Sequence, residues 1–264
     1  MSSSSSLLRP SLMICHPTLH NPTPDNAATF LRWTKLHNRD LLDLPATSHG
    51  DKITRALRFA KANATGASGE YFYTILSTRG AVWHSPQYRA RSTRLDLENT
   101  RVLGEGEEGV GCALGDMVWD ICEAKFCIYE EVRSGGVGGA GHGYADHPRG
   151  GGEKWVVGVS LDGDEGEVER VWKELVVYVQ RGVGEEGKVY SSLYKHGGKE
   201  AQPDKHPEIA GDRIGGGKWL VLVLIVDEKG DKGEGDIEGL VEDWGKDQGE
   251  GVTAGVWKEE LDMF

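Results

Sequence analysis

Two residues suited to proton transfer lie close together near the start of the chain. Trp33 and His37 are four positions apart, so on a helix they occupy the same stripe. A histidine side chain has an ordinary pKa of about 6.5, which lets it act as acid or base near neutral pH. His37 is therefore the candidate catalytic residue, with Trp33 as a candidate substrate contact. The alternatives are a helix histidine that caps a carbonyl or faces solvent, and a core tryptophan.

Arginine and tyrosine side chains on the next two predicted strands could contact the same substrate. Arg55 and Arg58 lie in the strand expected at residues 53–63, where the period of two puts them on opposite faces. At most one of them can point into a barrel, where it could hold a carboxylate or an enolate; an exposed strand arginine is the alternative. Tyr73 shares a face with Tyr71 and could offer its hydroxyl to an oxyanion, although core packing is its other use.

The start of the second predicted helix adds two further candidates. Ser85 and Pro86 suit the N-cap and the first helical position, so a helix is expected from about residue 87 towards residue 97. His84 and Tyr88 flank this start and could form the mouth of a cavity. An ordinary loop histidine is the alternative for His84.

The elements that would position these residues follow an order that occurs twice. Asp25 or Asn26 is the expected cap of the first helix, after a turn that contains Pro22 and Pro24. The first half reads strand, helix, strand, strand, helix, strand, at residues 12–16, 25–45, 53–63, 71–77, 87–97 and 124–132. The second half repeats this order at residues 155–161, 165–181, 189–194, 219–226, 237–244 and 252–257.

This order is the split βαβ, or ferredoxin-like, plan. The helices cover one face of each sheet, and the other face is apolar and must be buried. Two units in one chain can bury these faces against each other, so we predict an α+β fold in which two ferredoxin-like units pack sheet to sheet as an intramolecular α/β barrel. The expected parts are a disordered lead-in, a first unit, a Gly-rich linker and a second, degenerate unit, at residues 1–11, 12–132, 133–153 and 154–264.

Composition narrows the classes of partner. The chain has 264 residues and a net charge of -12, which argues against nucleic acid or an anionic membrane as a partner, because phosphate binding needs a basic surface. No window approaches the roughly 20 apolar residues of a membrane span, and the first residues lack a secretory signal. The four cysteines form no CxxC pair and read as free thiols in a reducing compartment. A cytoplasmic protein is expected.

Two further patterns predict no cofactor or metal. The glycine string at residues 135–143 is not a phosphate loop, because no Lys-Ser/Thr follows it. His142, His147 and the nearby Asp146 do not by themselves build a metal site. No cofactor and no metal are therefore expected.

One motif resembles a known family. The pattern Phe30-x-x-Trp33-x-x-x-His37 is similar to the F-x-x-W/Y-x-x-x-H pattern of the EthD-like branch of dimeric α/β-barrel proteins, and it looks closest to fungal proteins with two such units in one chain. The resemblance covers residues 12–132 well and residues 154–260 in outline. It implies small enzymes that bind compact aromatic or polyketide-like molecules inside the barrel, among them decarboxylases, dehydratases, isomerases and cofactor-free monooxygenases.

The second copy departs from this pattern. Trp172 corresponds to Trp33, but Val176 stands where the histidine would be, so any chemistry is expected in the first copy. The prediction is a small-molecule-binding barrel, with His37 as acid or base of a cofactor-independent lyase or isomerase. The alternative is a non-catalytic barrel that binds a ligand or another protein. The expected partner is a small hydrophobic or aromatic ligand, and the expected state is a monomer with an internal pseudo-dimer, or a weak homodimer.

Overall fold

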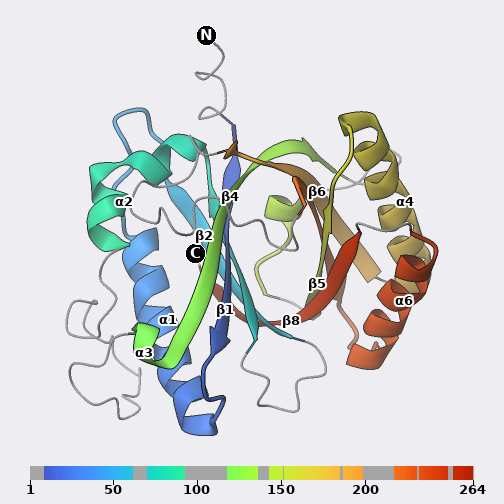
Figure 1. Ribbon diagram of the computed structural model, residues 1–264, viewed down its shortest axis with the longest axis horizontal. Helices are drawn as coiled ribbons and strands as arrows, with labels where there is room; N and C mark the ends of the chain where they lie inside the picture. The colour runs from blue at the N-terminus through green and yellow to red at the C-terminus, as the bar shows by residue number, and fades with distance from the viewer. Residues whose placement is uncertain are drawn as a thin grey trace.

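The chain forms a closed barrel of eight strands with its longer helices on the outside (Figure 1). The predicted α+β class and the closed barrel are confirmed. The structure is a computed structural model that describes residues 9–61, 70–92, 118–135, 143–150, 152–184, 187–198, 217–230, 232–248 and 252–263. The predictions for residues 1–8, for residues 136–142 of the glycine string, including His142, and for Cys112, one of the four cysteines, lie outside the described residues.

The first half of the chain supplies four strands and two helices that cover them. The strands are β1 (Ser11–Leu19), β2 (Ile53–Lys61), β3 (Tyr71–Ser77) and β4 (Cys122–Ser134). The helices are α1 (Pro24–Leu42) and α2 (Pro86–Arg91), with two short elements, η2 (Gly80–His84) and α3 (Val118–Ile121).

The second half has the same arrangement of elements. The strands are β5 (Glu153–Leu161), β6 (Gly187–His196), β7 (Trp219–Asp227) and β8 (Thr253–Met263). The helices are α4 (Glu165–Val183) and α6 (Glu234–Lys246), and a short turn, η3 (Tyr144–Asp146), precedes β5. Figure 1 shows α1 and α2 on one side of the barrel and α4 and α6 on the opposite side.

The strand order explains how the barrel closes. One half runs β4-β1-β3-β2 and the other runs β8-β5-β7-β6, which is the ferredoxin-like order in each case. Antiparallel pairing of β2 with β8 and of β4 with β6 joins the two halves. Closure leaves no sheet edge exposed and buries the two apolar inner faces against each other.

Alternation along β2 sets which side chains enter the barrel. Leu57 and Phe59 belong to the interior core, whereas Ala56 packs in the core under α1 and α2. Arg55 follows the phase of Leu57 and Arg58 follows the phase of Ala56. The prediction that the two arginines lie on opposite faces is therefore confirmed.

The N-cap of the first helix lies two residues before the first of the two predicted caps. Thr23 is the N-cap, and its hydroxyl oxygen accepts a hydrogen bond from the backbone N–H of Asn26 at 3.2 Å. Pro24 occupies the first turn, where its fixed φ and missing N–H are tolerated. The prediction of Asp25 or Asn26 as cap is wrong, because Thr23, just before a proline, offers a side-chain oxygen that meets the same requirement.

The second helix is shorter than predicted. Ser85 caps it through a hydrogen bond from the N–H of Tyr88 at 3.1 Å, as expected, but it ends at Arg91. Ser92 is the C-cap, and its hydroxyl donates to the carbonyl of Arg89 at 3.4 Å. A serine that bonds the nearby backbone in this way competes with the helical hydrogen bonds, so the helix stops before residue 97.

The second half packs around one large core. Residues at helical spacing on the inner face of α4 are buried in it with β5, β6 and β7: Val168, Val171, Trp172, Leu175 and Val179. Within the described part of the chain, no helix has the length and apolar character needed to cross a membrane.

The glycine-rich stretch before β5 does more than connect the halves. Tyr144 has no exposed surface, and its hydroxyl lies 2.8 Å from the hydroxyl of Thr74, whose side chain points into the barrel. The N–H of Tyr144 also donates to the Ser192 hydroxyl at 3.0 Å. This segment therefore fills one end of the barrel interior.

Candidate functional site

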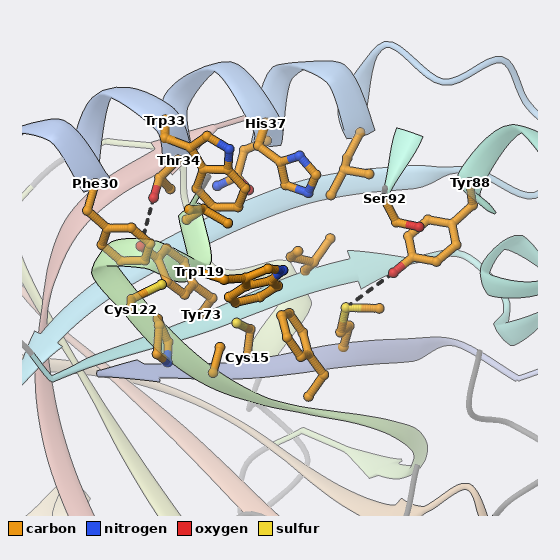
Figure 2. A pocket seen from close by; sticks show the side chains of 18 residues that line it. Cys15, Phe30, Trp33, Thr34, His37, Tyr73, Tyr88, Ser92, Trp119 and Cys122 are labelled. Carbon is orange, nitrogen blue, oxygen red and sulfur yellow. Dashed lines mark hydrogen bonds between the residues drawn. The ribbon is translucent and has the colours of Figure 1, made fainter. Parts of the chain in front are cut away.

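A pocket lies between α1 and the outer face of the first sheet (Figure 2). Its floor consists of outward-pointing residues of β1, β3 and β4, including Cys15, Tyr73 and Phe126. Residues of α2 and α3 close its sides. The resemblance implies binding inside the barrel, but this pocket lies outside it, because α1 covers the outer face of the sheet.

The helix side of the pocket is built by residues three or four positions apart. Phe30, Trp33, His37 and Leu41 share one face of α1 and line the pocket. The ring centroids of Trp33 and His37 are 4.6 Å apart with an interplanar angle of 12°, and those of Phe30 and Trp33 are 5.9 Å apart at 10°. The half-buried imidazole of His37 thus lies at one end of a stack of three rings.

Two tyrosine hydroxyls reach the pocket from opposite ends. The Tyr73 hydroxyl lies 2.9 Å from the hydroxyl of Thr34, and the Tyr88 hydroxyl donates to the sulfur of Met13 at 3.5 Å. Burial raises the pKa of both tyrosines far above the ordinary value, so both hydroxyls stay protonated at neutral pH. They can act as hydrogen-bond donors to an oxygen but not as bases.

The thiols in the pocket are not nucleophiles at neutral pH. Burial raises the pKa of Cys15 well above its ordinary value and that of Cys122 to about 12. Because the thiolate is the reactive form, neither side chain is poised for nucleophilic attack. Both are free thiols, as predicted, and buried, as is Cys127, which points into the barrel; buried thiols of this kind pack as small hydrophobes.

The structure brings together four of the seven residues singled out from the sequence. His37, Trp33, Tyr73 and Tyr88 all line the pocket. Arg58, Arg55 and His84 do not belong to its lining. His84 ends the short helix η2, next to α2 but away from the pocket wall.

Arg58 packs against two tyrosines of β3, one of which, Tyr73, lines the pocket. Its guanidinium carbon lies 4.1 Å from the ring centroid of Tyr71 and 5.8 Å from that of Tyr73, and its Nε lies 2.9 Å from a carboxylate oxygen of Glu260. Only 2% of its side chain is exposed. The predicted substrate contact is thus occupied with stacking and an ion pair.

Arg55 belongs to a buried charge cluster inside the barrel. Its Nε donates to a carboxylate oxygen of Asp262 at 2.7 Å, and its Nη1 donates to the carbonyl of His147 at 2.8 Å. Lys154, with 1% of its side chain exposed, places Nζ 3.1 Å from Glu259 and 3.6 Å from Asp262. Two carboxylates are therefore balanced by two cations.

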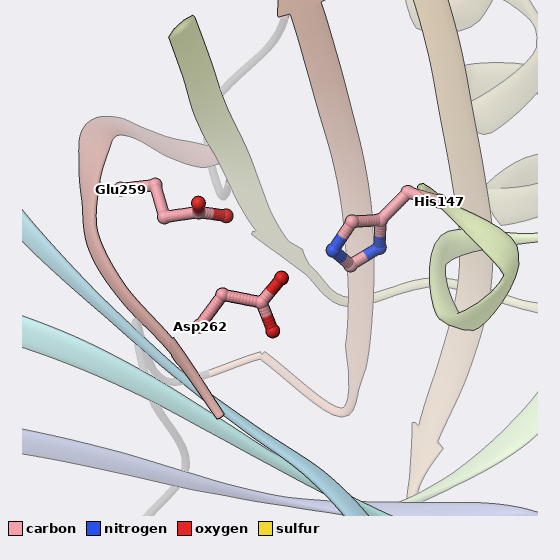
Figure 3. A group of neighbouring side chains, drawn as sticks. All are labelled: His147, Glu259 and Asp262. Atoms are coloured by element: carbon pink, nitrogen blue, oxygen red, sulfur yellow. The ribbon is translucent and has the colours of Figure 1, made fainter. Parts of the chain in front are cut away.

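Three side chains of this cluster have the chemistry of metal ligands (Figure 3). One ligand atom from each of His147, Glu259 and Asp262 lies within 4.8 Å of the others. The cations Arg55 and Lys154 already neutralise the two carboxylates, so a divalent ion would lie next to two like charges. We interpret the trio as part of a structural ion-pair cluster.

His147 makes the stability of this cluster depend on pH. Its Nδ1 must donate to the carbonyl of Tyr144, which can only accept. Burial, with the charge of Arg55, lowers the pKa of His147 to about 4. Since the unfolded state binds its proton near pH 6.5, the stability contributed above that pH is lost as the pH falls from 6.5 towards 4, by about 3 kcal/mol in total.

This loss can be measured by urea unfolding at pH 7 and pH 4.5. His147→Asn keeps an N–H that can donate to the Tyr144 carbonyl but cannot titrate, so its free energy of unfolding should fall less over this range. The lowered pKa of Asp262, where Arg55 outweighs burial, adds a loss at still lower pH in both proteins. Equal pH slopes for the two proteins would contradict the assignment.

Sequence reasoning missed several residues of the pocket. Trp119 lies in its middle, between the sheet and the rings of α1 (Figure 2), and its ring packs edge-on against Phe126 with centroids 6.0 Å apart. It belongs to the four-residue helix α3, too short to show a periodicity. Cys15 could have been found, because a period of two places it outward between Ile14 and His16.

Comparison with known proteins identifies the architecture. No family model matches the chain, and no curated protein sequence matches it. A solved structure from Fusobacterium nucleatum, described as a candidate monooxygenase, superposes with a TM-score of 0.50 and 8% identity over 96% of this chain and 94% of that one. An anthrone oxidase-like protein gives a TM-score of 0.49 and 8% identity over 100% and 95% of the chains.

A third solved structure is a chlorite dismutase from Candidatus Nitrospira defluvii, with a TM-score of 0.47 and 7% identity over 98% and 93% of the chains. Sequence identities this low carry information on the fold alone. The strand order of the barrel and the superposition on the Fusobacterium nucleatum protein over nearly the whole length of both chains agree on that fold. The chain thus shares its fold with that protein, an α/β barrel, and builds it from two ferredoxin-like units in one polypeptide.

Proposed function

We propose that the pocket under α1 binds a compact, mainly apolar molecule and that His37 moves a proton to or from it. The observation that carries this proposal is the position of the imidazole, which stacks on Trp33 at the wall of an otherwise largely apolar pocket. Ligand sites of this type combine apolar walls with a few polar groups that orient the ligand. His37, Tyr73 and Tyr88 are those groups here.

The proposed reaction class is that of a cofactor-independent lyase or isomerase, such as a decarboxylase or dehydratase, acting on an aromatic or polyketide-like molecule. Such reactions need a base or acid at carbon and a donor for the oxygen that gains negative charge. His37 supplies the first. Tyr88 supplies the second, because its hydroxyl donates to a thioether sulfur, a weak acceptor that a ligand oxygen would replace.

Trp119 limits the volume of this pocket that a ligand can occupy. The cavity volume is about 50 Å³, enough for a few water molecules but below the roughly 300 Å³ of typical ligand sites. The half-buried Trp119 lies across the middle of the pocket (Figure 2). A ligand that enters must therefore displace the indole ring.

Removal of that ring should make binding easier. Trp119→Ala is expected to bind small aromatic acids and phenols about tenfold more tightly than the wild type, because no side chain has to be displaced. Titration calorimetry measures this change. Trp119→Phe keeps an aromatic ring in the space and should stay close to the wild type. Equal affinity of all three proteins would show that the indole does not occupy the binding site.

A turnover screen tests the catalytic part of the proposal. Wild-type protein is incubated with a panel of aromatic and polyketide-like acids, and products are detected by mass spectrometry. Turnover of a panel member that is lost in His37→Gln supports the enzyme. Binding of panel members without turnover supports the alternative, a non-catalytic ligand-binding barrel.

One observation favours that alternative. In the second half of the chain, Val176 stands where the pattern of the first half has His37, and it is 4% exposed in the core under α4. The second helix therefore contributes packing in place of a polar group. A barrel in which both helices serve packing would need no reaction at His37.

A further inference from the structure

We propose that a second binding site lies inside one end of the barrel and takes a small, neutral aromatic molecule that carries a hydroxyl group. This inference does not depend on the function proposed for the α1 pocket. The cavity here has a volume of about 200 Å³, against about 50 Å³ for the α1 pocket. For comparison, an engineered protein cavity of about 150 Å³ accepts benzene.

The two sites lie on opposite faces of the same strands. On β1, Cys15 points outward into the α1 pocket, whereas His16 points inward and lines the barrel cavity. On β3, Tyr73 points outward into the α1 pocket, and Phe72 points inward and lines the barrel cavity. A ligand in one site therefore touches different side chains from a ligand in the other, although both sites share a wall.

The cavity exists because only one end of the barrel is filled. An eight-stranded barrel is just wide enough to be filled by side chains or to hold one small ligand. Tyr144 and the ion pair of Arg55 with Asp262 fill the end where β2 begins. Lys61, the last residue of β2, lines the cavity at the opposite end.

Two paired glycines shape the wall of the cavity. Gly158 of β5 and Gly255 of β8 face each other across the strands, and both line the cavity. A Cβ on Gly255 would lie 2.4 Å from the Trp257 ring, and one on Gly158 would lie 3.1 Å from it. The missing side chains let the indole lie close against the backbone, where it stacks on Phe72 with centroids 4.7 Å apart.

The aromatic residues favour a planar ligand. The imidazole of His16 lies edge-on to both Phe72 and Trp257, with centroid distances of 6.5 and 6.2 Å. Flat rings of this kind give offset-stacked and edge contacts to another ring. Leu220 adds an aliphatic contact, so most of the cavity wall is apolar, with the hydroxyls of Ser160 and Thr253 as further polar groups of the lining.

Two buried polar atoms define the polar group of the ligand. Nε2 of His16 and Nε1 of Trp257 are buried and have no hydrogen-bond partner among the residues that the structure describes. An indole N–H can only donate, whereas burial lowers the pKa of His16 and so favours the neutral ring, which can accept. A hydroxyl group can accept from the indole N–H of Trp257 and donate to Nε2 of His16.

The charges at the rim argue against an anion. Lys61 and Glu70 both line the cavity, and Lys61 Nζ lies 2.6 Å from a carboxylate oxygen of Glu70. The pair is neutral, so the residues that line the cavity offer no net positive charge to a carboxylate or phosphate. A phenol satisfies every feature of the site: it is planar, neutral and carries one hydroxyl.

Binding of 4-fluorophenol, followed by fluorine NMR and calorimetry, tests the site. The wild type should bind it at least about tenfold more tightly than fluorobenzene, because fluorobenzene leaves both polar atoms unpaired. His16→Leu and Trp257→Phe should each weaken 4-fluorophenol about tenfold while changing fluorobenzene little. His16 lies at the barrel end and is half-buried, so His16→Leu keeps the test valid should Trp257→Phe impair folding.

Three outcomes would overturn the inference. The first is no binding of 4-fluorophenol to the folded wild type. The second is binding that His16→Leu leaves unchanged. The third is binding that Trp119→Ala alters and His16→Leu does not, because that result places the phenol in the α1 pocket.

Discussion

His37→Gln should lower the turnover number for any substrate of the wild type by at least about 100-fold, because general acid–base catalysis typically contributes a factor of 10² to 10⁴. Glutamine fills similar space and keeps hydrogen-bonding capacity but cannot take up or release a proton near neutral pH. The ligand dissociation constant should change little, since the apolar walls and the stacked Trp33 remain. Single-turnover kinetics combined with calorimetry separates the two quantities.

An exposed histidine provides the matched control. His49 lies in the exposed turn before β2 and does not line the pocket, so His49→Gln should keep full activity. The pH profile gives a second check: a limb of the wild-type profile that reports protonation of His37 should be missing in His37→Gln. Full activity of His37→Gln would reject the proposed role of the imidazole.

Arg55→Met should lower the free energy of unfolding by about 3–5 kcal/mol, the usual cost of removing one partner of a buried ion pair. The substitution leaves Asp262, whose side chain is 10% exposed, without its bidentate partner. It also removes the donor to the carbonyl oxygen of His147. Lys154 Nζ, at 3.6 Å, remains near the carboxylate but does not replace the lost hydrogen bonds. Denaturant unfolding at pH 7 gives the value.

Two further variants serve as comparisons for Arg55→Met. Arg133→Met removes an arginine whose pair with Glu165 is about half exposed on both sides, so the loss should stay below about 1 kcal/mol. The double variant Arg55→Met/Asp262→Leu removes one positive and one negative charge together and should recover much of the stability. A loss as small in Arg55→Met as in Arg133→Met would show that the buried cluster is not a stabilising contact.

The sequence predicted the parts of the pocket that depend on local geometry. The four-residue spacing of Trp33 and His37 places them on one stripe of any helix, and the rings do stack. Alternation along a strand likewise separates Arg55 from Arg58 and places Tyr73 on one face. These relations hold whatever the rest of the fold does.

Relations between distant parts of the chain were not predictable in this way. Periodicity shows that a sheet has two faces, but it does not show that a pocket lies between α1 and the outer face. It gave no signal for Trp119, whose helix has four residues. The partners Arg55 and Asp262 are 207 positions apart, and His147 reaches them from a glycine-rich stretch that reads as a linker.

The pairing of β2 with β8 also constrains the order of folding. During synthesis, β2 emerges long before its partner, since Ala56 pairs with Met263. Until β8 is made, the first sheet has an open edge and an uncovered apolar face, which are the features that make nascent chains prone to aggregation. Contacts of such long sequence separation also form slowly. Barrel closure is therefore a late event in folding, and the nascent first half is the stage at which a chaperone would be needed most.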